Sequence, residues 1–190
     1  MKHRLFLAIP IPANFRQEVL KVSKVSEVSE AIRWVPYENY HITISFLGHV
    51  EEEKIPTIAQ IGDEIAKRTP PFTLEFDKIT LAPLRKSPRM IWALLQKNDA
   101  FTNLVREVEE SLIKNNLSPK RTHSPTPHIT LARLNKSIKY KVSSIKEFSL
   151  HSLYLPLYTN ILISSFTLYE SKLSPKGSLY IPLQHFHFHN

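Results

Sequence analysis

Cysteine is absent from this 190-residue chain, and glycine is scarce, with only Gly48, Gly62 and Gly177. The absence of cysteine excludes disulfide scaffolds, thiolate zinc sites, iron–sulfur clusters and cysteine nucleophiles. With so few glycines no glycine-rich loop is available to hold a phosphate, which excludes Walker and dinucleotide-binding folds. Long apolar runs are also missing, because prolines interrupt the short run at residues 5–11. We therefore expect neither a signal peptide nor a membrane span.

Positive charge is in excess, since 25 Lys+Arg against 17 Asp+Glu give a formal net charge of +8. This excess favours an anionic partner such as nucleic acid, a nucleotide or a phosphorylated metabolite. Hydrophobic residues make up 42% of the chain and charged residues 22%, which excludes a disordered or fibrous protein. At this length we expect residues 1–190 to form a single two-lobed domain. A chain without cysteine fits a reducing compartment, so we expect a cytoplasmic monomer.

The hydrophobic pattern alternates between strand and helix periods along the chain. The expected strands cover residues 4–9, 40–47, 72–81, 90–96 and 128–134, and two or three more follow residue 148, the last at 178–189. The expected helices cover residues 12–29, 51–68 and a segment from an N-cap at Asp99 to residues 115–116. This order predicts an α+β fold with mainly antiparallel pairing.

One tetrapeptide pattern occurs twice, as His41-Ile42-Thr43-Ile44 and as His128-Ile129-Thr130-Leu131. Each copy falls in an expected strand, whose period of two puts His and Thr on one face and the apolar residues on the other. A single copy would be an ordinary half-exposed strand. Two copies in the two halves of a basic chain predict a pseudo-twofold cleft into which both His/Thr pairs point.

Two imidazoles and two hydroxyls suit the cleavage of a phosphodiester by water. Imidazole, with a pKa of about 6.5, serves as either acid or base near neutral pH. The reaction needs a base for the water and an acid for the departing oxygen, on opposite sides of phosphorus. Threonine hydroxyls can donate hydrogen bonds to the other phosphate oxygens. Because two histidines without nearby carboxylates make a poor zinc site, we expect neither a metal ion nor a cofactor.

Residues flanking the two motifs extend the pattern over nearly the whole chain. They are residues 4–9, 33–36, 38–48, 88–89 with 92–93, 127–133, and Ser171, Leu173, Pro175, Gly177 and Tyr180 near the end. Together with the motifs, these segments resemble the RNA 2',3'-cyclic phosphodiesterases, also called 2'-5' RNA ligases, of the two-histidine phosphoesterase superfamily.

The resemblance implies two mainly antiparallel sheets with flanking helices around a central cleft. It implies hydrolysis of an RNA or nucleotide 2',3'-cyclic phosphate to a 2'-phosphate. His41 would be the proton donor to the 3'-oxygen and His128 the proton acceptor from water. Thr43, Thr130 and Arg133 would bind the phosphate. Period-two counting puts Arg133 on the opposite face from His128, so that role requires a strand end or a bulge.

Several positions depart from the family or resist assignment. Where Ser45 stands the family often has a basic residue, so we expect one contact to the phosphate or to the nucleic-acid backbone to be missing. Residues 151–161 look longer than the family's usual connection and are interpreted as a surface insertion, with a substrate-facing loop as the alternative. Strict alternation predicts Phe46 in the core rather than against a base, whereas Trp34 stays open as a stacking residue. The alternating histidines at 185–189 predict an edge strand with one wet face.

Other functions remain open at this point. The basic residues form either a phosphate-tracking surface around the cleft or an ordinary solvated surface; they are Arg33, Arg85, Lys86, Arg89, Lys120, Arg121 and Lys136. A non-catalytic RNA-binding module would use the same cleft, and its binding would survive the loss of both motif histidines. A third possibility is another reaction on this scaffold, such as 2'-5' RNA ligation or cleavage of a different phosphodiester.

Overall fold

The structure is a computed structural model that describes residues 1–13, 15–17, 32–83, 88–117, 125–134, 160–174 and 177–189. Most of the expected 12–29 helix and of the 151–161 segment lies outside these residues. So do the basic residues expected at positions 85, 86, 120, 121 and 136.

Within this part of the chain, strands dominate. The strands are β1 (Lys2–Pro10), β2 (Ile32–Trp34), β3 (His41–Glu51), β4 (Phe72–Ala82), β5 (Met90–Leu95), β6 (His128–Leu134), β7 (Asn160–Ile163), β8 (Ser165–Ser174) and β9 (Gly177–His187). The helices are α2 (Ile55–Arg68) and α3 (Asp99–Lys114), with single 3-10 turns η1 (Tyr37–Asn39) and η2 (Glu52–Lys54).

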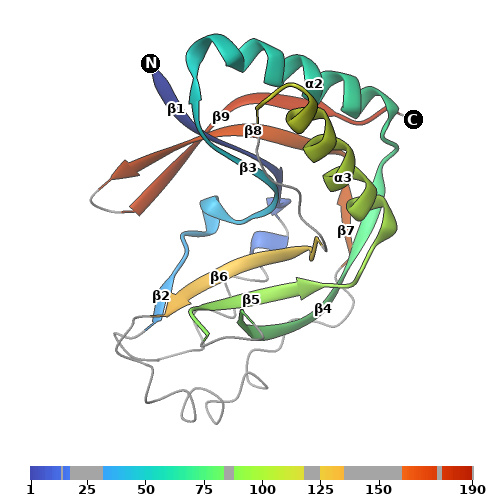
Figure 1. The fold of residues 1–190 in the computed structure, drawn as a ribbon. Coiled ribbons are helices and arrows are strands. Elements are labelled where there is room, and N and C mark those ends of the chain that lie inside the picture. The colour runs from blue at the N-terminus through green and yellow to red at the C-terminus, as the bar shows by residue number, and fades with distance from the viewer. Residues whose placement is uncertain are drawn as a thin grey trace.

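The strands form one sheet in the order β7-β4-β5-β6-β3-β1-β8-β9, with β2 paired to β6. Every strand pair in it is antiparallel, so the predicted α+β fold with mainly antiparallel pairing is confirmed. The sheet curves strongly from β9 round to β4 (Figure 1). The two expected sheets are joined where the motif strands β3 and β6 meet, through the single register pair Ile42–Ile129.

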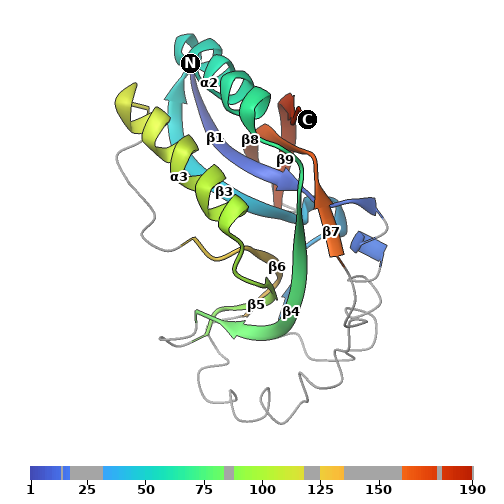
Figure 2. The same cartoon turned by 90° about the vertical axis from the view of Figure 1, so that its right-hand side faces the viewer.

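The two helices pack against each other and against the β3, β8 and β9 part of the sheet. Figure 2 shows them lying next to one another over this lobe. Helix α2 starts later than expected, because residues 52–54 form the turn η2 and Pro56 lies in the first turn of the helix. The predicted apolar face of α2 is buried at Ile58, Ile61 and Ile65. The helices therefore cover the lobe of the sheet that contains β3, β8 and β9.

Helix α3 begins after Asn98, whose side-chain oxygen accepts a hydrogen bond from the Phe101 backbone N (3.0 Å). The N-cap is therefore Asn98, and the prediction of Asp99, which is the first helical residue, was wrong by one position. Both residue types cap well, so composition alone could not separate them. The buried stripe of α3 is as predicted, at Phe101, Leu104, Val105, Val108 and Leu112.

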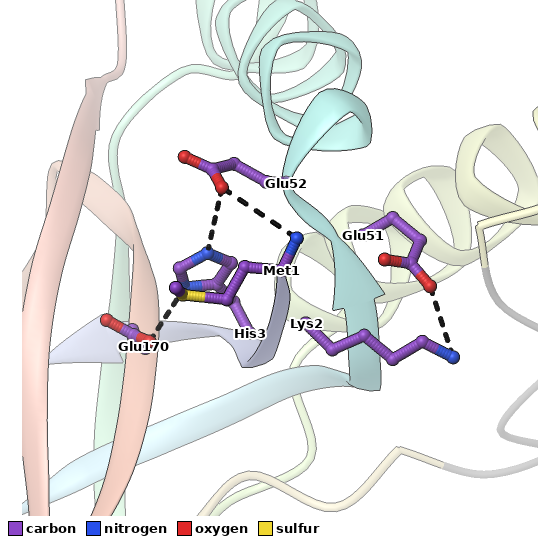
Figure 3. A network of polar contacts seen from close by, with 6 residues as sticks. All are labelled: Met1, Lys2, His3, Glu51, Glu52 and Glu170. Atoms are coloured by element: carbon purple, nitrogen blue, oxygen red, sulfur yellow. Dashed lines mark hydrogen bonds and ion pairs between the residues drawn. The ribbon is translucent and has the colours of Figure 1, made fainter.

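A polar network joins the start of β1 to η2 and to β8. His3 Nδ1 lies 2.8 Å from Glu170 Oε1, and His3 Nε2 lies 3.9 Å from Glu52 Oε2 (Figure 3). The hydrogen bond with His3 lowers the pKa of the Glu170 carboxyl, aided by the Lys172 charge and opposed by partial burial. The network fixes β1, one of the strands beside the cleft, at its outer end.

The C-terminal strand has the predicted alternation. His185 and His187 are exposed, whereas Phe186 between them is buried. His185 Nδ1 is hydrogen-bonded to Thr167 Oγ1 (2.9 Å). Of the helices described, none is long and apolar enough to cross a membrane.

Candidate active site

The two motifs meet at the centre of the sheet, where their second residues, Ile42 and Ile129, pair with each other. Antiparallel pairing between equivalent residues creates a local twofold axis between the two strands. Continuing this register by one residue on either side puts the histidine of each motif opposite the threonine of the other, on one face. The two imidazoles therefore lie on opposite sides of the axis, and so do the two hydroxyls.

Each imidazole is hydrogen-bonded to a backbone carbonyl just before its own strand. His41 Nδ1 lies 2.7 Å from the Asn39 carbonyl oxygen, and His128 Nδ1 lies 2.8 Å from the Thr126 carbonyl oxygen. A carbonyl oxygen only accepts, so each Nδ1 carries a hydrogen and donates it. Each Nε2 is then left for a ligand, as a base in the neutral ring and as an acid in the cation.

Burial lowers the pKa of His41 and of His128, and the hydrogen bond to the carbonyl opposes this effect in each case. The positive charges of His128 and Arg133 lower the pKa of His41 further. In the free protein both rings therefore favour the neutral form at pH 7. An anion bound between them would raise both pKa values, because it stabilises the imidazolium.

Arg133 reaches the same face because β6 contains a bulge. The register between β5 and β6 skips Leu131, which is an extra residue on β6. Leu131 and Ala132 are both buried, so the alternation shifts by one position there. The exposed Arg133 thereby returns to the face of His128 and Thr130. The bulge that a phosphate-binding role for Arg133 requires is therefore present.

A matching bulge occurs in β3, where the register with β1 skips Ile44. Ile44 and Ser45 are both buried, and Phe46 is 68% exposed. The prediction that Phe46 lies in the core is therefore wrong, because strict alternation stops at the bulge. Phe46 occupies in the first motif the position that Arg133 occupies in the second. The local axis thus relates an aromatic ring to a guanidinium.

The site residues expected from the sequence line one cleft of about 520 Å³: His41, Thr43, His128, Thr130 and Arg133. A second, largely apolar cavity of about 330 Å³ adjoins it, because Thr43, Phe46 and His128 line both. His49 is exposed on β3 and lines neither cavity.

Aromatic side chains pack on the two imidazoles in different ways. The Trp92 indole is stacked on His128, with ring centroids 3.8 Å apart and planes at 25°. Tyr180 meets His41 edge-on at 5.2 Å, and Phe6 is tilted against it at 5.1 Å. Trp92 was not among the residues predicted for the site, although its place between the apolar Ile91 and Ala93 is typical of the polar face of a strand. Stacking on the face of indole favours the protonated imidazole.

Metal-ligating groups do not gather at this site. Over the residues that the structure describes, no three or more His, Asp or Glu side chains are placed to hold a metal ion. The polar side chains that line the cleft carry imidazole, hydroxyl, amide and guanidinium groups. Hydrogen-bond donors and proton-transfer groups of this kind suit a phosphate ester.

Comparison with known proteins agrees with this chemistry. The sequence model of the LigT like Phosphoesterase family matches residues 9–92. A Methanocaldococcus jannaschii protein named RNA 2',3'-cyclic phosphodiesterase is 30% identical over 182 residues, covering 93% of this chain and 96% of that protein. An Archaeoglobus fulgidus protein of the same name is 29% identical over 183 residues, covering 96% and 99%. The crystal structure of apo E. coli LigT has a TM-score of 0.75 and 26% identity, covering 100% of this chain and 99% of LigT.

Fold, site and relatives together define a phosphoesterase, an enzyme that hydrolyses phosphate esters. The chain belongs to the RNA 2',3'-cyclic phosphodiesterase family, the LigT-like phosphoesterases.

Proposed function

We propose that this enzyme hydrolyses the 2',3'-cyclic phosphate of an RNA end, or of a nucleotide, to a 2'-phosphate without a metal ion. One observation carries the proposal: both imidazoles line one cleft, and each is held by a carbonyl at Nδ1 so that Nε2 is left for the substrate. The names of the relatives support an RNA cyclic phosphate as substrate. Crystal structures of E. coli LigT complexed with phosphate, ATP and NADP+ support a nucleotide-binding cleft.

In this mechanism the phosphorus atom sits near the local twofold axis, between the two histidines. His128 Nε2 accepts a proton from water as the water oxygen bonds to phosphorus. The bond from phosphorus to the 3'-oxygen breaks, and protonated His41 gives its proton to that oxygen. The products are a 2'-phosphate and a 3'-hydroxyl. Attack and departure on opposite sides of phosphorus require an acid and a base on opposite sides, which the axis provides.

Thr43, Thr130 and Arg133 bind the phosphate oxygens in this proposal. The two hydroxyls alternate with the two imidazoles around the axis, so each donates to a different oxygen that does not react. Arg133 presents several N–H donors and a full charge, which suits an oxyanion. Because the cleft is partly buried, these donors stabilise the charge that builds up in the transition state.

Phe46 is proposed to stack the base of the reacting nucleotide. Its ring is 68% exposed at the junction of the cleft and the adjoining apolar cavity. Stacking on an aromatic side chain stabilises a bound base by about 1–3 kcal/mol, whichever base it is. Phe46→Ser is therefore expected to raise KM for a cyclic mononucleotide and to leave kcat within a few-fold.

The decisive experiment is incubation of the protein with 2',3'-cyclic CMP in excess EDTA, with the products separated by chromatography. We expect 2'-CMP to form. His41→Gln and His128→Gln should each reduce kcat by about a hundredfold to ten-thousandfold, the usual contribution of a general acid or base. His49→Gln, an exposed histidine outside the cleft, is the matched control and should keep full activity.

Three outcomes would count against the proposal. Absence of product in EDTA refutes metal-free catalysis, and formation of 3'-CMP refutes the assignment of the departing oxygen. RNA binding that survives both histidine substitutions, without turnover, indicates a binding module instead. Cytoplasmic location and a monomeric state stay predictions, and cell fractionation and light scattering test them.

A further inference from the structure

Arg33 and Arg133 are directly paired across the β2–β6 ladder. Directly paired residues of antiparallel strands point to the same side, with Cβ atoms about 4.5–5.5 Å apart, and like charges in such a pair destabilise the sheet. Both side chains are exposed, and both line a small cavity of about 110 Å³ at the edge of the cleft. Two positive charges are thus held together at a specific place.

No carboxylate offsets this pair in the described part of the chain. Neither Arg33 nor Arg133 takes part in any of the ion pairs found there. The other side chains that line the small cavity are aromatic, aliphatic or neutral polar. An anion from outside the chain would therefore turn a repulsive pair into an attractive site.

The wall around the pair is built by the β8–β9 hairpin. Gly177 has φ +128°, a backbone conformation that favours glycine, and a Cβ there would lie 2.9 Å from Arg33 Nη2, so the guanidinium packs closely against this turn. The Asn39 side-chain amide donates to the Ser178 carbonyl (2.9 Å), while the Asn39 carbonyl accepts from His41. One residue thus fixes both the hairpin beside the arginine pair and the ring of a proposed catalytic histidine.

The small cavity continues from the cleft on its Arg133 side, since Asn39, Arg133 and Tyr180 line both. A guanidinium has five N–H donors in a planar fork, so Arg133 can bind the reacting phosphate on one edge and a second anion on the other. A 2',3'-cyclic phosphate ends its RNA chain. Any further phosphate of the same strand therefore lies on the 5' side of the reacting nucleotide.

We propose that Arg33 and Arg133 together bind the phosphodiester on the 5' side of the nucleotide that carries the cyclic phosphate. This inference rests on the proposed function. It makes the enzyme selective for RNA ends over cyclic mononucleotides, because only the former carry the second phosphate. It also gives Arg33 a role in specificity that is separate from the reacting groups.

The test compares 2',3'-cyclic CMP with a cytidine dinucleotide that ends in a 2',3'-cyclic phosphate. A third substrate is the same dinucleotide with an uncharged methylphosphonate in place of its internal phosphate. We expect wild-type kcat/KM to be about tenfold or more higher for the charged dinucleotide than for the methylphosphonate, the contribution of a charge-assisted hydrogen bond. In Arg33→Gln this difference should shrink several-fold, because only Arg133 is left to bind the internal phosphate. Lys67→Gln, an equal charge change at an exposed site on α2, should preserve it.

Two further readouts separate recognition from structure. The slope of log kcat/KM against log salt for the dinucleotide should become shallower by about 0.7 in Arg33→Gln, as expected for one lost contact with single-stranded RNA. Thermal unfolding of Arg33→Gln should occur at or above the wild-type temperature, because a like-charge contact has been removed.

Either of two results would overturn the inference: a methylphosphonate penalty that is equal in wild type and Arg33→Gln, or a lower unfolding temperature in the variant. Failure of the proposed function looks different, because the wild-type protein would then convert none of the three substrates.

Discussion

Replacing Arg133 with glutamine is expected to move one limb of the pH–rate profile and to leave the other in place. Burial is the main reason that the pKa of His41 is low, and the charges of His128 and Arg133 lower it further. The pKa of His128 is set by burial and by its bond to the Thr126 carbonyl. Without Arg133, His41 therefore keeps its proton to higher pH. Since the proposed acid must be protonated, the alkaline limb of kcat/KM moves to higher pH.

The strength of the interaction between Arg133 and His41 follows from their separation in the sheet. His41 faces Thr130 across the two strands, and the bulge makes Arg133 the next side chain of β6 on this face. Diagonal neighbours of this kind have Cβ atoms roughly 7–8 Å apart. At roughly 8 Å, and an effective dielectric constant between about 20 and 80, the Coulomb energy is about 0.5–2 kcal/mol. An interaction of this size is enough to move the alkaline limb of the profile to higher pH by a measurable amount.

The assay is the initial rate on 2',3'-cyclic CMP at limiting substrate, from pH 4.5 to pH 9, for wild type, Arg133→Gln and Lys67→Gln. The overall rate of Arg133→Gln should fall because a phosphate contact is lost. The pH values at which the two limbs of the profile fall do not depend on the overall rate. Movement of the acidic limb instead would exchange the roles of His41 and His128. Limbs that both stay in place would refute the electrostatic link between Arg133 and His41.

Three further predictions concern stability and the packing around the site. Glu170→Gln should lower the free energy of unfolding at pH 7 by about 0.5–1.5 kcal/mol. This loss should shrink below about pH 4, because a carboxyl with a lowered pKa stabilises the fold only while it is ionised. Urea denaturation at both pH values measures the two losses. Trp92→Leu should lower kcat roughly fivefold, since about 1 kcal/mol of cation–π stabilisation of protonated His128 is lost; Trp92→Phe keeps a ring and should lose less, so equal losses would contradict a role for the stacked face. Gly62→Ala should cost about 1–3 kcal/mol of stability, because its Cβ would lie 2.5 Å from Cζ of the buried Phe186; adding Phe186→Leu should cost less than the two single losses summed, and additive losses would exclude this clash.

Local pattern was enough to predict the strands other than β2, the apolar faces of both described helices and the doubled motif. These features depend on residues close together in the chain, whose periods of 2 and 3.6 can be read directly. The buried faces of α2 and α3 are those that the spacing predicted. The alternation of β4 likewise puts Leu74 and Phe76 inside and Thr73 and Glu75 outside.

The bulges could not be predicted, because a bulge is a property of two paired strands and not of one. In each motif the extra residue is the second apolar one, Ile44 or Leu131, and it reverses the alternation of the residues that directly follow it. This single local event explains why Ser45 is buried, Phe46 exposed and Arg133 available to the cleft. The pairing of Arg33 with Arg133 was hidden for the same reason, since it depends on which distant strand β2 joins.

The local twofold axis also bears on which ribose oxygen keeps the phosphate in the proposed reaction. If the backbone symmetry extended to the side chains, a cyclic phosphate would bind equally well in two orientations related by half a turn. Each orientation would present a different ribose oxygen to the acid, and the enzyme would release a mixture of 2'- and 3'-phosphates. The bulges place a ring, Phe46, at one end of the cleft and a cation, Arg133, at the other. A nucleotide has a flat base and a charged backbone, so in the proposed mechanism we expect it to bind in one orientation, which would decide which ribose oxygen keeps the phosphorus.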